Sequence, residues 1–291
     1  MSPNHDVEAS DMTWNEQPLT FTVDGVDLTA ILHRAEPAST RAMLLIVGGP
    51  QYRVGSHRQF VEFARAMAAS GTSVLRFDYR GMGDSAGPYL DFEQVEADVL
   101  AALDTLQSEL PNTTHTSVFG LCDAASTALM VAAFDSRVSE LVLLNPWVRS
   151  EATEAKAVVK HYYGKRFLSG EFWKKLLRGQ VNVMASLVDV VKKIKLSRQV
   201  SPVATTYVDF REHMLRGAQH FSGRVLLILS GNDFTANEFE DWVAQSADWR
   251  EAVANWTHSR VAEANHTFSR SDWKQQVVED VRSWLAVDDE V

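Results

Sequence analysis

One cysteine in this sequence stands where a nucleophile for acyl chemistry would stand. Cys122 lies between an apolar run that ends at Gly120 and a helical stretch, in the segment TSVFGLCDAAS. The pattern Gly120-x-Cys122-x-Ala124 is typical of a nucleophile elbow, a sharp strand-to-helix turn, with sulfur in place of the usual serine oxygen. A helix N-terminus and a nearby histidine both favour the reactive thiolate. The context therefore predicts a nucleophile, although a lone cysteine is more often a buried core residue.

A thiolate nucleophile needs a base, and the base needs an acid that orients it, in the chain order nucleophile, acid, histidine. Asp233 follows an apolar run and so stands at the expected carboxyl end of a strand. His266 follows the last predicted strand and precedes the final helix, whereas His258 lies before that strand, at its wrong end. We therefore predict His266 as the base and Asp233 as the orienting acid. Glu238 and Asp241 are the alternative acids, more simply explained as solvated helix charges.

The same chemistry needs N–H donors for a developing oxyanion. The backbone N–H of Asp123, next to the nucleophile, is the first predicted donor. The second is expected in the glycine loop after the third strand, where Pro50 has no N–H, so Gly49 or Gln51 must supply it. Three further residues of this loop are weaker candidates for binding substrate, because exposed loop residues are common: Tyr52, Arg53 and His57.

A literal G-x-S-x-G motif also occurs, at residues 83–87, with Ser85 at its centre. The preceding strand ends near Asp78, and helical pattern resumes only near Phe92. Ser85 is therefore expected in a glycine-rich loop and not in a strand-to-helix turn. This context favours Cys122 over Ser85 as the nucleophile.

The elements that must position these residues are short apolar runs that alternate with helical stretches. Such runs, without internal alternation, predict buried strands of a mostly parallel sheet with helices on both faces. The first two strands are expected to form an antiparallel hairpin that turns at Asp24-Gly25. The later strands are predicted at 43–47, 73–78, 116–120, 141–144, 224–229 and 259–262, and the helices at about 57–69, 92–110, 122–134 and 271–285. We therefore expect an α/β protein with an eight-stranded sheet.

The domain organisation follows from where this alternation breaks. We predict a flexible tail at residues 1–16, a core of 17–146 and 222–291, and an inserted helical cap at 147–221. Residues 151–200 carry eleven Lys and Arg against four Asp and Glu, a net charge of +7, whereas the rest of the chain carries −17. Three interpretations stay open: a site for an anionic group such as the phosphates of coenzyme A or a carrier-bound pantetheine, a solvated face, or loose docking of an amphipathic helix near 181–198 on anionic lipid.

Composition excludes several other classes. The 291 residues carry a net charge of −10, which disfavours nucleic acid as a partner. A single cysteine cannot form an internal disulfide, and no metal-ligand cluster or nucleotide-binding loop is evident, so no cofactor or metal is expected. The first twenty residues lack an apolar signal region, and no apolar run approaches the length of a membrane span. These features predict a cytoplasmic protein, and the residues above predict that it acts on a small-molecule acyl substrate.

A series of motifs resembles a known group of proteins between about residues 19 and 286. In order they are VGGPQYRVGSHRQF, FDYRGMGDS, GLCDAAS, LLNPWVR, HYYGKRF, LLILSGND and NHTF. The chain resembles the α/β-hydrolase superfamily, and more narrowly the type 1 hydrolases associated with exosortase A systems, which are encoded near exopolysaccharide and protein-sorting genes. The resemblance implies the α/β-hydrolase fold and the assignment of Cys122, Asp233 and His266, but no substrate. Ala124 replaces the family's usual glycine.

The chemistry of a sulfur nucleophile limits which acyl compounds this site is expected to act on. A thiolate that attacks a thioester exchanges one thioester for another, so the acyl-enzyme is not higher in free energy than the substrate. We therefore predict hydrolysis of an acyl thioester or activated ester through Cys122, His266 and Asp233. Two alternatives stay open: an acyltransferase with an amine or alcohol acceptor, and a catalytically silent binding module with the same fold.

Overall fold

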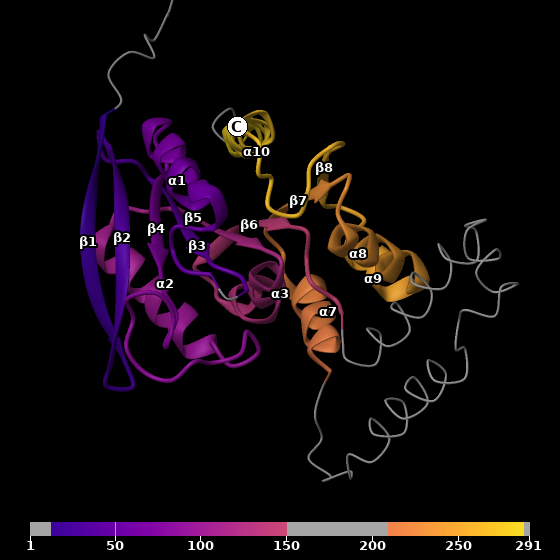
Figure 1. The fold of residues 1–291 in the computed structure, drawn as a ribbon, viewed down its shortest axis with the longest axis horizontal. Helices are drawn as coiled ribbons and strands as arrows, with labels where there is room; N and C mark the ends of the chain where they lie inside the picture. The colour runs from indigo at the N-terminus through magenta and orange to yellow at the C-terminus, as the bar shows by residue number, and fades with distance from the viewer. Residues whose placement is uncertain (1–12, 50, 150–208, 288–291) are drawn as a thin grey trace, which may run out of the picture. The chain divides into compact units, whose positions relative to one another are not determined.

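The strands form one sheet in the computed structural model, which describes residues 13–49, 51–149 and 209–287. Its eight strands lie in the order β1-β2-β4-β3-β5-β6-β7-β8 (Figure 1). β2 pairs antiparallel with β1 and β4, and the other neighbours pair in parallel, which confirms the predicted mostly parallel sheet. The strands are β1 (Thr13–Val23), β2 (Val26–Glu36), β3 (Arg41–Ile46), β4 (Ser73–Phe77), β5 (His115–Leu121), β6 (Val138–Leu144), β7 (Arg224–Ser230) and β8 (Thr257–Val261).

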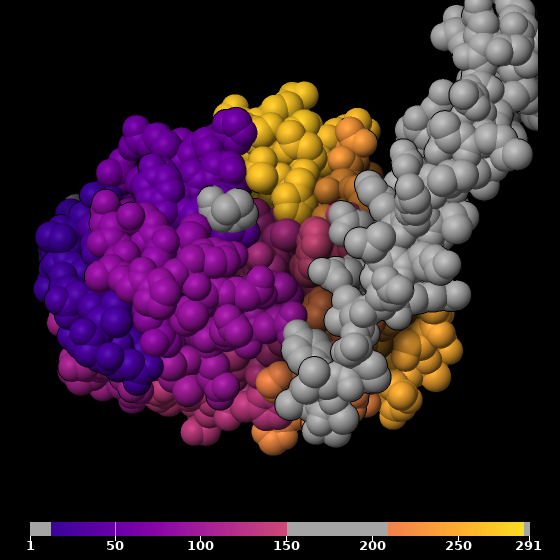
Figure 2. Space-filling model, turned by 60° about the horizontal axis from the view of Figure 1, so that its bottom comes forward, coloured from indigo at the N-terminus to yellow at the C-terminus, as the bar shows by residue number. Residues whose placement is uncertain are grey.

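Helices cover both faces of this sheet. The helices described are α1 (Gln59–Ala69), α2 (Glu96–Glu109), α3 (Asp123–Met130), α7 (Phe210–His220), α8 (Phe234–Gln245), α9 (Ala247–Ala252) and α10 (Ser271–Ala286), with short 3₁₀ turns at Ser56–Arg58 and Ala132–Phe134. α1 and α10, far apart in the sequence, lie side by side on one face, and the other helices cover the opposite face (Figure 1, Figure 2). Two apolar clusters fill the two sides, which explains why the central strands show no polar alternation.

The hairpin turns at Asp24 and Gly25, whose φ angles of 51° and 79° are those of a tight two-residue turn. β1 begins at Thr13, which pairs with Glu36, so residues 13–16 are strand and not part of the predicted tail. The sequence did not indicate that the strand begins so early, because β1 is an edge strand whose first residues are mostly exposed and polar.

The predicted cap at 147–221 lies largely outside the described residues, which resume at Asp209. Its C-terminal end forms α7, which packs on α3 as part of the core. Gly217 makes this approach close, because a Cβ there would lie 1.7 Å from the carbonyl oxygen of Leu129. Within the described part of the chain, no helix is both long and apolar enough to cross a membrane.

Ser85 has a structural role in this fold. Its hydroxyl accepts a hydrogen bond of 2.8 Å from the N–H of Thr29 on β2 and donates one of 2.7 Å to the carbonyl of Asp78, just after β4. A Cβ at Gly83 would lie 2.1 Å from the Asp78 carboxylate, so the glycine-rich loop wraps closely around that side chain. The G-x-S-x-G sequence thus fastens the loop of residues 81–87 to the sheet.

Replacing Ser85 by alanine should therefore weaken the fold. Ser85→Ala leaves the Thr29 N–H without its acceptor, and we expect the free energy of unfolding to fall by about 1–2 kcal/mol, measured by urea denaturation. Ser108→Ala, at an exposed position on α2, is the matched control and should change it by less than about 0.5 kcal/mol. Equal stability of the two variants would contradict a structural role for Ser85.

Candidate active site

The predicted elbow is a strained turn between β5 and α3. Cys122 has φ 65° and ψ −126°, a left-handed backbone conformation that a non-glycine residue rarely adopts. Its N–H donates to the carbonyl of Leu144 at the end of β6, over 2.9 Å. Gly120 permits the turn, since a Cβ there would lie 2.5 Å from the carbonyl oxygen of Ala124. The thiol is partly buried and packs against the apolar cluster under α1 and α10.

His266 and Asp233 form a hydrogen-bonded pair. The imidazole Nδ1 lies 2.9 Å from Asp233 Oδ2, and the acid is 8% exposed while the histidine side chain is 33% exposed. Asp233 also caps α8, where its Oδ2 accepts from the N–H of Ala236 over 3.1 Å. Burial opposes ionisation of Asp233, but the His266 hydrogen bond and charge, with the N–H groups at the start of α8, outweigh it and lower the pKa of Asp233. The Nε2 edge of the imidazole is thereby left to act on a partner.

The alternative candidates lie elsewhere. His258 is exposed on β8, beside Leu227 in the register of the sheet and away from the carboxyl end of the strand. Glu238 and Asp241 lie on α8, and Asp241 is exposed. Asp233 is thus the acid that the structure brings to His266.

Asn145 ties the strand ends of this site together, and sequence analysis missed it. Its Oδ1 accepts from the N–H of Ser230 over 2.8 Å, and its Nδ2 donates to Ser230 Oγ over 2.9 Å and to the carbonyl of His266 over 3.1 Å. It is fully buried and has φ 44°. The N–H of Cys122 binds the carbonyl of Leu144, the residue before Asn145. The backbones of Cys122 and His266 are therefore connected by two hydrogen bonds, one to Leu144 and one from Asn145. A polar residue directly after the apolar run 141–144 was the available signal.

The predicted oxyanion loop binds Asp123, the residue after the predicted nucleophile. The N–H of Gly49 donates to Asp123 Oδ1 over 2.7 Å, and the N–H of Gln51 donates to the carbonyl of Gly49 over 2.8 Å. A Cβ at Gly48 would lie 2.3 Å from the same carboxylate oxygen. Both predicted donors of this loop are therefore engaged in this conformation, one of them by an internal carboxyl group.

Burial, together with the nearby charge of Asp91, raises the pKa of Asp123 to about 6 against the opposing hydrogen bonds from the N–H groups of Gly49 and Ala124. At neutral pH the carboxylate is an anion that occupies the N–H of Gly49, one of the predicted oxyanion donors. Protonation of the acid would weaken this hydrogen bond, and rotation of the side chain would break it.

The three weaker loop candidates divide into two kinds. Arg53 is held by acids: its guanidinium contacts Asp78 and Asp84, and its N–H donates to Asp78 Oδ1 over 2.6 Å. Arg53 thereby fastens the oxyanion loop to β4 and is not directed at a substrate in this conformation. Tyr52 and His57 are exposed on the same loop.

Among the described residues, no three His, Cys, Asp or Glu side chains cluster closely enough to hold a metal ion. The chemistry available to this arrangement is that of a thiol, an imidazole and two carboxyl groups.

The raised pKa of Asp123 has a consequence for stability. The pKa of Asp123 in the folded chain, about 6, exceeds the ordinary value of 3.8, so the fold favours the protonated acid and loses stability as pH rises from about 4 to 6. Asp123→Asn removes this penalty, and we expect it to raise the free energy of unfolding by up to about 3 kcal/mol at pH 8 and by almost nothing at pH 4. Denaturant melts at both pH values test this. Asp241→Asn is the exposed control, and a gain for Asp123→Asn that is independent of pH would contradict the assignment.

Asn145 yields a second prediction. Asn145→Ala leaves the buried Ser230 N–H and His266 carbonyl unpaired, so the free energy of unfolding should fall by about 2–3 kcal/mol. We also expect iodoacetamide to alkylate Cys122 about tenfold more slowly in the folded variant, with an altered pH profile, because the imidazole loses its anchor. Asn237→Ala, exposed on α8, should match the parent chain in both measurements. An unchanged alkylation profile in Asn145→Ala would reduce Asn145 to a stabilising residue.

Solved structures with the same fold include several hydrolases. The Pyrococcus furiosus esterase Pf2001 superposes with a TM-score of 0.63 at 16% identity, covering 94% of this chain and 90% of the esterase. Est1E from Butyrivibrio proteoclasticus, with ferulic acid bound, gives 0.60 at 14% identity over 92% and 97%. The α/β hydrolase GrgF from Penicillium sp. sh18 gives 0.57 at 18% identity over 93% and 96%. At these identities the similarity establishes the fold alone.

Sequence comparison adds a curated relative and a family. The polyketide transferase grgF of a Penicillium species is 31% identical over 133 residues, which span 44% of this chain and 44% of that relative, less than half of its length. The model of the family described as serine aminopeptidase, S33 matches residues 38–253, most of the chain. This chain belongs to the serine aminopeptidase S33 family, and its fold is that of the α/β hydrolases.

Proposed function

We propose that this chain hydrolyses an acyl thioester or an activated ester through a covalent intermediate on Cys122. His266 acts as the base and Asp233 orients it. One observation carries the proposal: the residue held in a left-handed turn at the end of β5 is a cysteine, on the same sheet edge as the His266–Asp233 pair. The family's description names a serine, but Ser85 in the literal serine motif is bound to two backbone groups of the sheet.

The proposed reaction consists of two acyl transfers, the first to Cys122 and the second to water. His266 Nε2 takes the thiol proton, and the Cys122 sulfur forms a bond to the acyl carbon while the carbonyl electrons move onto oxygen. That oxygen collects the N–H of Asp123 and, once the carboxyl group withdraws, that of Gly49. The bond to the leaving thiolate or alkoxide then breaks, and His266 returns the proton to it. Water, deprotonated by His266, then attacks the acyl carbon of the Cys122 thioester; the carbon–sulfur bond breaks, His266 returns the proton to the Cys122 sulfur, and the carboxylic acid leaves.

Acyl transfer to another acceptor is the second candidate, because the grgF relative is named a polyketide transferase. The same acyl-enzyme would then pass its acyl group to an amine or alcohol instead of water. The segment 151–200 has a net charge of +7, and we propose that it favours a leaving group that carries phosphates, such as coenzyme A or a carrier-bound pantetheine. The link to exosortase systems stays a proposal on the resemblance of the motifs.

Adduct formation tests the proposal directly. Incubation with the N-acetylcysteamine thioester of hexanoic acid should add one acyl mass to the parent chain, located on Cys122 by peptide mass spectrometry. Cys122→Ala should lack the adduct and lose at least about 10³-fold in turnover, and Asp233→Asn should lose about 10²–10⁴-fold because the imidazole is no longer oriented. Added amines or alcohols that are converted faster than water identify a transferase.

Ser85→Ala is the matched nucleophile control and should keep turnover within about twofold in its folded fraction. Activity lost in Ser85→Ala but kept in Cys122→Ala would show that the nucleophile is the serine. A fully folded chain that forms no adduct with any acyl thioester and turns none of them over would favour the alternative of a catalytically silent binding module.

A further inference from the structure

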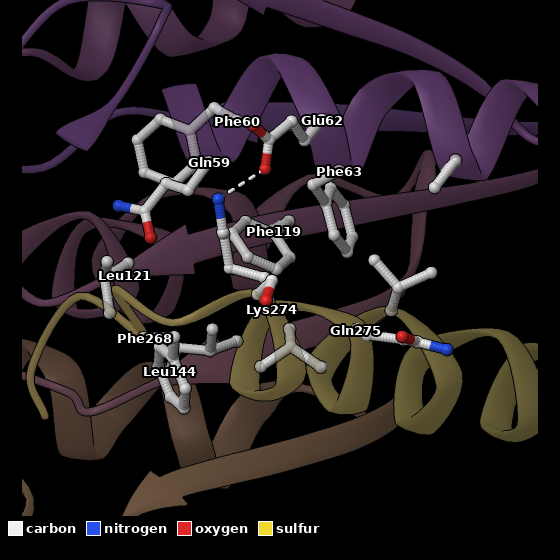
Figure 3. Close-up of a pocket in the computed structure, with 14 residues that line it drawn as sticks. Gln59, Phe60, Glu62, Phe63, Phe119, Leu121, Leu144, Phe268, Lys274 and Gln275 are labelled. Atoms are coloured by element: carbon white, nitrogen blue, oxygen red, sulfur yellow. Dashed lines mark hydrogen bonds and ion pairs between the residues drawn. The ribbon is translucent and has the colours of Figure 1, made fainter. Parts of the chain in front are cut away.

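A cavity of about 260 Å³ lies between α1 and α10, on the face of the sheet that carries the apolar cluster beneath Cys122 (Figure 3). Its floor includes Leu121 and Leu144, which directly precede Cys122 and Asn145, and Phe268, two residues after His266. The partly buried Cys122 packs against the same cluster. The lining thus contains chain neighbours of Cys122, Asn145 and His266, whereas Cys122 and His266 themselves are not among the lining residues.

The walls of the cavity are chiefly apolar. Phe60 and Phe63 of α1 and Phe119 of β5 contribute aromatic rings, with Phe119 and Phe63 centred 4.5 Å apart. Lys274 of α10 and Glu62 of α1 form an ion pair of 2.5 Å that joins the two helices across the cavity (Figure 3). These two charges neutralise each other, so the lining favours an uncharged, apolar occupant.

One polar group in the lining has no partner. Gln59 is 7% exposed, and its Nε2 is buried without a hydrogen bond among the described residues. Gln59 lies at the same end of the cavity as Leu121, the neighbour of Cys122, and away from Gln275 (Figure 3). An unpaired buried donor is unfavourable, and an acceptor oxygen on an occupant would offset that cost.

We propose that this cavity binds the acyl chain of the substrate, and that Gln59 donates a hydrogen bond to an oxygen carried by that chain near its thioester end. The substrate class is therefore an apolar acyl thioester with a keto or hydroxyl group close to the reacting carbon. This inference rests on the proposed acyl chemistry of Cys122 and adds the identity of the acyl group to it.

Chain-length selectivity tests the cavity. We compare N-acetylcysteamine thioesters of acetate, butanoate, hexanoate and octanoate by kcat/KM. The parent chain should gain up to about fourfold for each added methylene until the cavity is filled, since each buried methylene contributes about 0.8 kcal/mol. Ala66→Phe, which fills the cavity from α1, should lower the octanoyl-to-acetyl ratio at least tenfold, and Val278→Phe should do the same from α10 if the first variant does not fold.

Ala97→Phe is the matched control, a partly buried alanine on α2 over the opposite face, and should leave that ratio unchanged. Gln59→Leu should lower the preference for the 3-oxooctanoyl over the octanoyl thioester by about five- to tenfold. An octanoyl-to-acetyl ratio that both filling variants leave unchanged overturns the cavity assignment, and an unchanged 3-oxo preference in Gln59→Leu overturns the role of Gln59.

A binding measurement separates this inference from the proposed function. The amide analogue of the octanoyl thioester is a far poorer acyl donor, and Cys122→Ala has no thiol to acylate, so calorimetric binding of the analogue to this variant reports on the cavity alone. Binding that Ala66→Phe and Val278→Phe weaken at least tenfold supports the cavity even if no Cys122 adduct ever forms. Adducts that form normally while the analogue binds all variants equally leave the acyl chemistry intact and overturn the cavity.

Discussion

The left-handed backbone at Cys122 is the constraint from which the rest of this site follows. A non-glycine residue in such a conformation costs about 1–3 kcal/mol and persists only where its surroundings impose it. Here β5 must reverse directly into α3, and missing side chains at Gly120 and Gly48 let the helix and the neighbouring loop approach the turn. The turn sets the start of α3, and so the N–H of Asp123, and holds Cys122 against the end of β6 through the Leu144 carbonyl.

Parallel strands leave their last backbone groups without ladder partners, and this fold satisfies them with side chains. The side chains of Asn145, directly after β6, and Ser230, at the end of β7, bind each other, the N–H of Ser230 and the carbonyls of Asn265 and His266 in the loop after β8. The position of His266 therefore depends on buried residues of two other strands as well as on Asp233. Strand order brings these groups together: β5, β6, β7 and β8 are consecutive neighbours, so the residues that follow them share one edge.

The sequence was sufficient for features that local chemistry determines. Apolar runs predicted the buried strands, Asp24-Gly25 predicted the hairpin, and order along the chain selected the His266–Asp233 pair that the structure joins. The catalytic role of Cys122 stays a prediction. Features that depend on residues distant in the sequence were not predicted. The hydrogen bond from the N–H of Gly49 to the Asp123 carboxylate joins residues 74 positions apart, and the one from Asn145 to the carbonyl of His266 joins residues 121 positions apart.

The internal carboxylate connects binding to chemistry. Burial is the largest cause of the raised pKa of Asp123, so a substrate that covers the site and excludes more water would raise that pKa further. The acid would then take up a proton, lose its charge-assisted hold on the N–H of Gly49, and leave that donor to the developing oxyanion. Without substrate, the anion keeps the N–H of Gly49 occupied. Under the proposed chemistry, that donor becomes available to the oxyanion only when an acyl group covers the site.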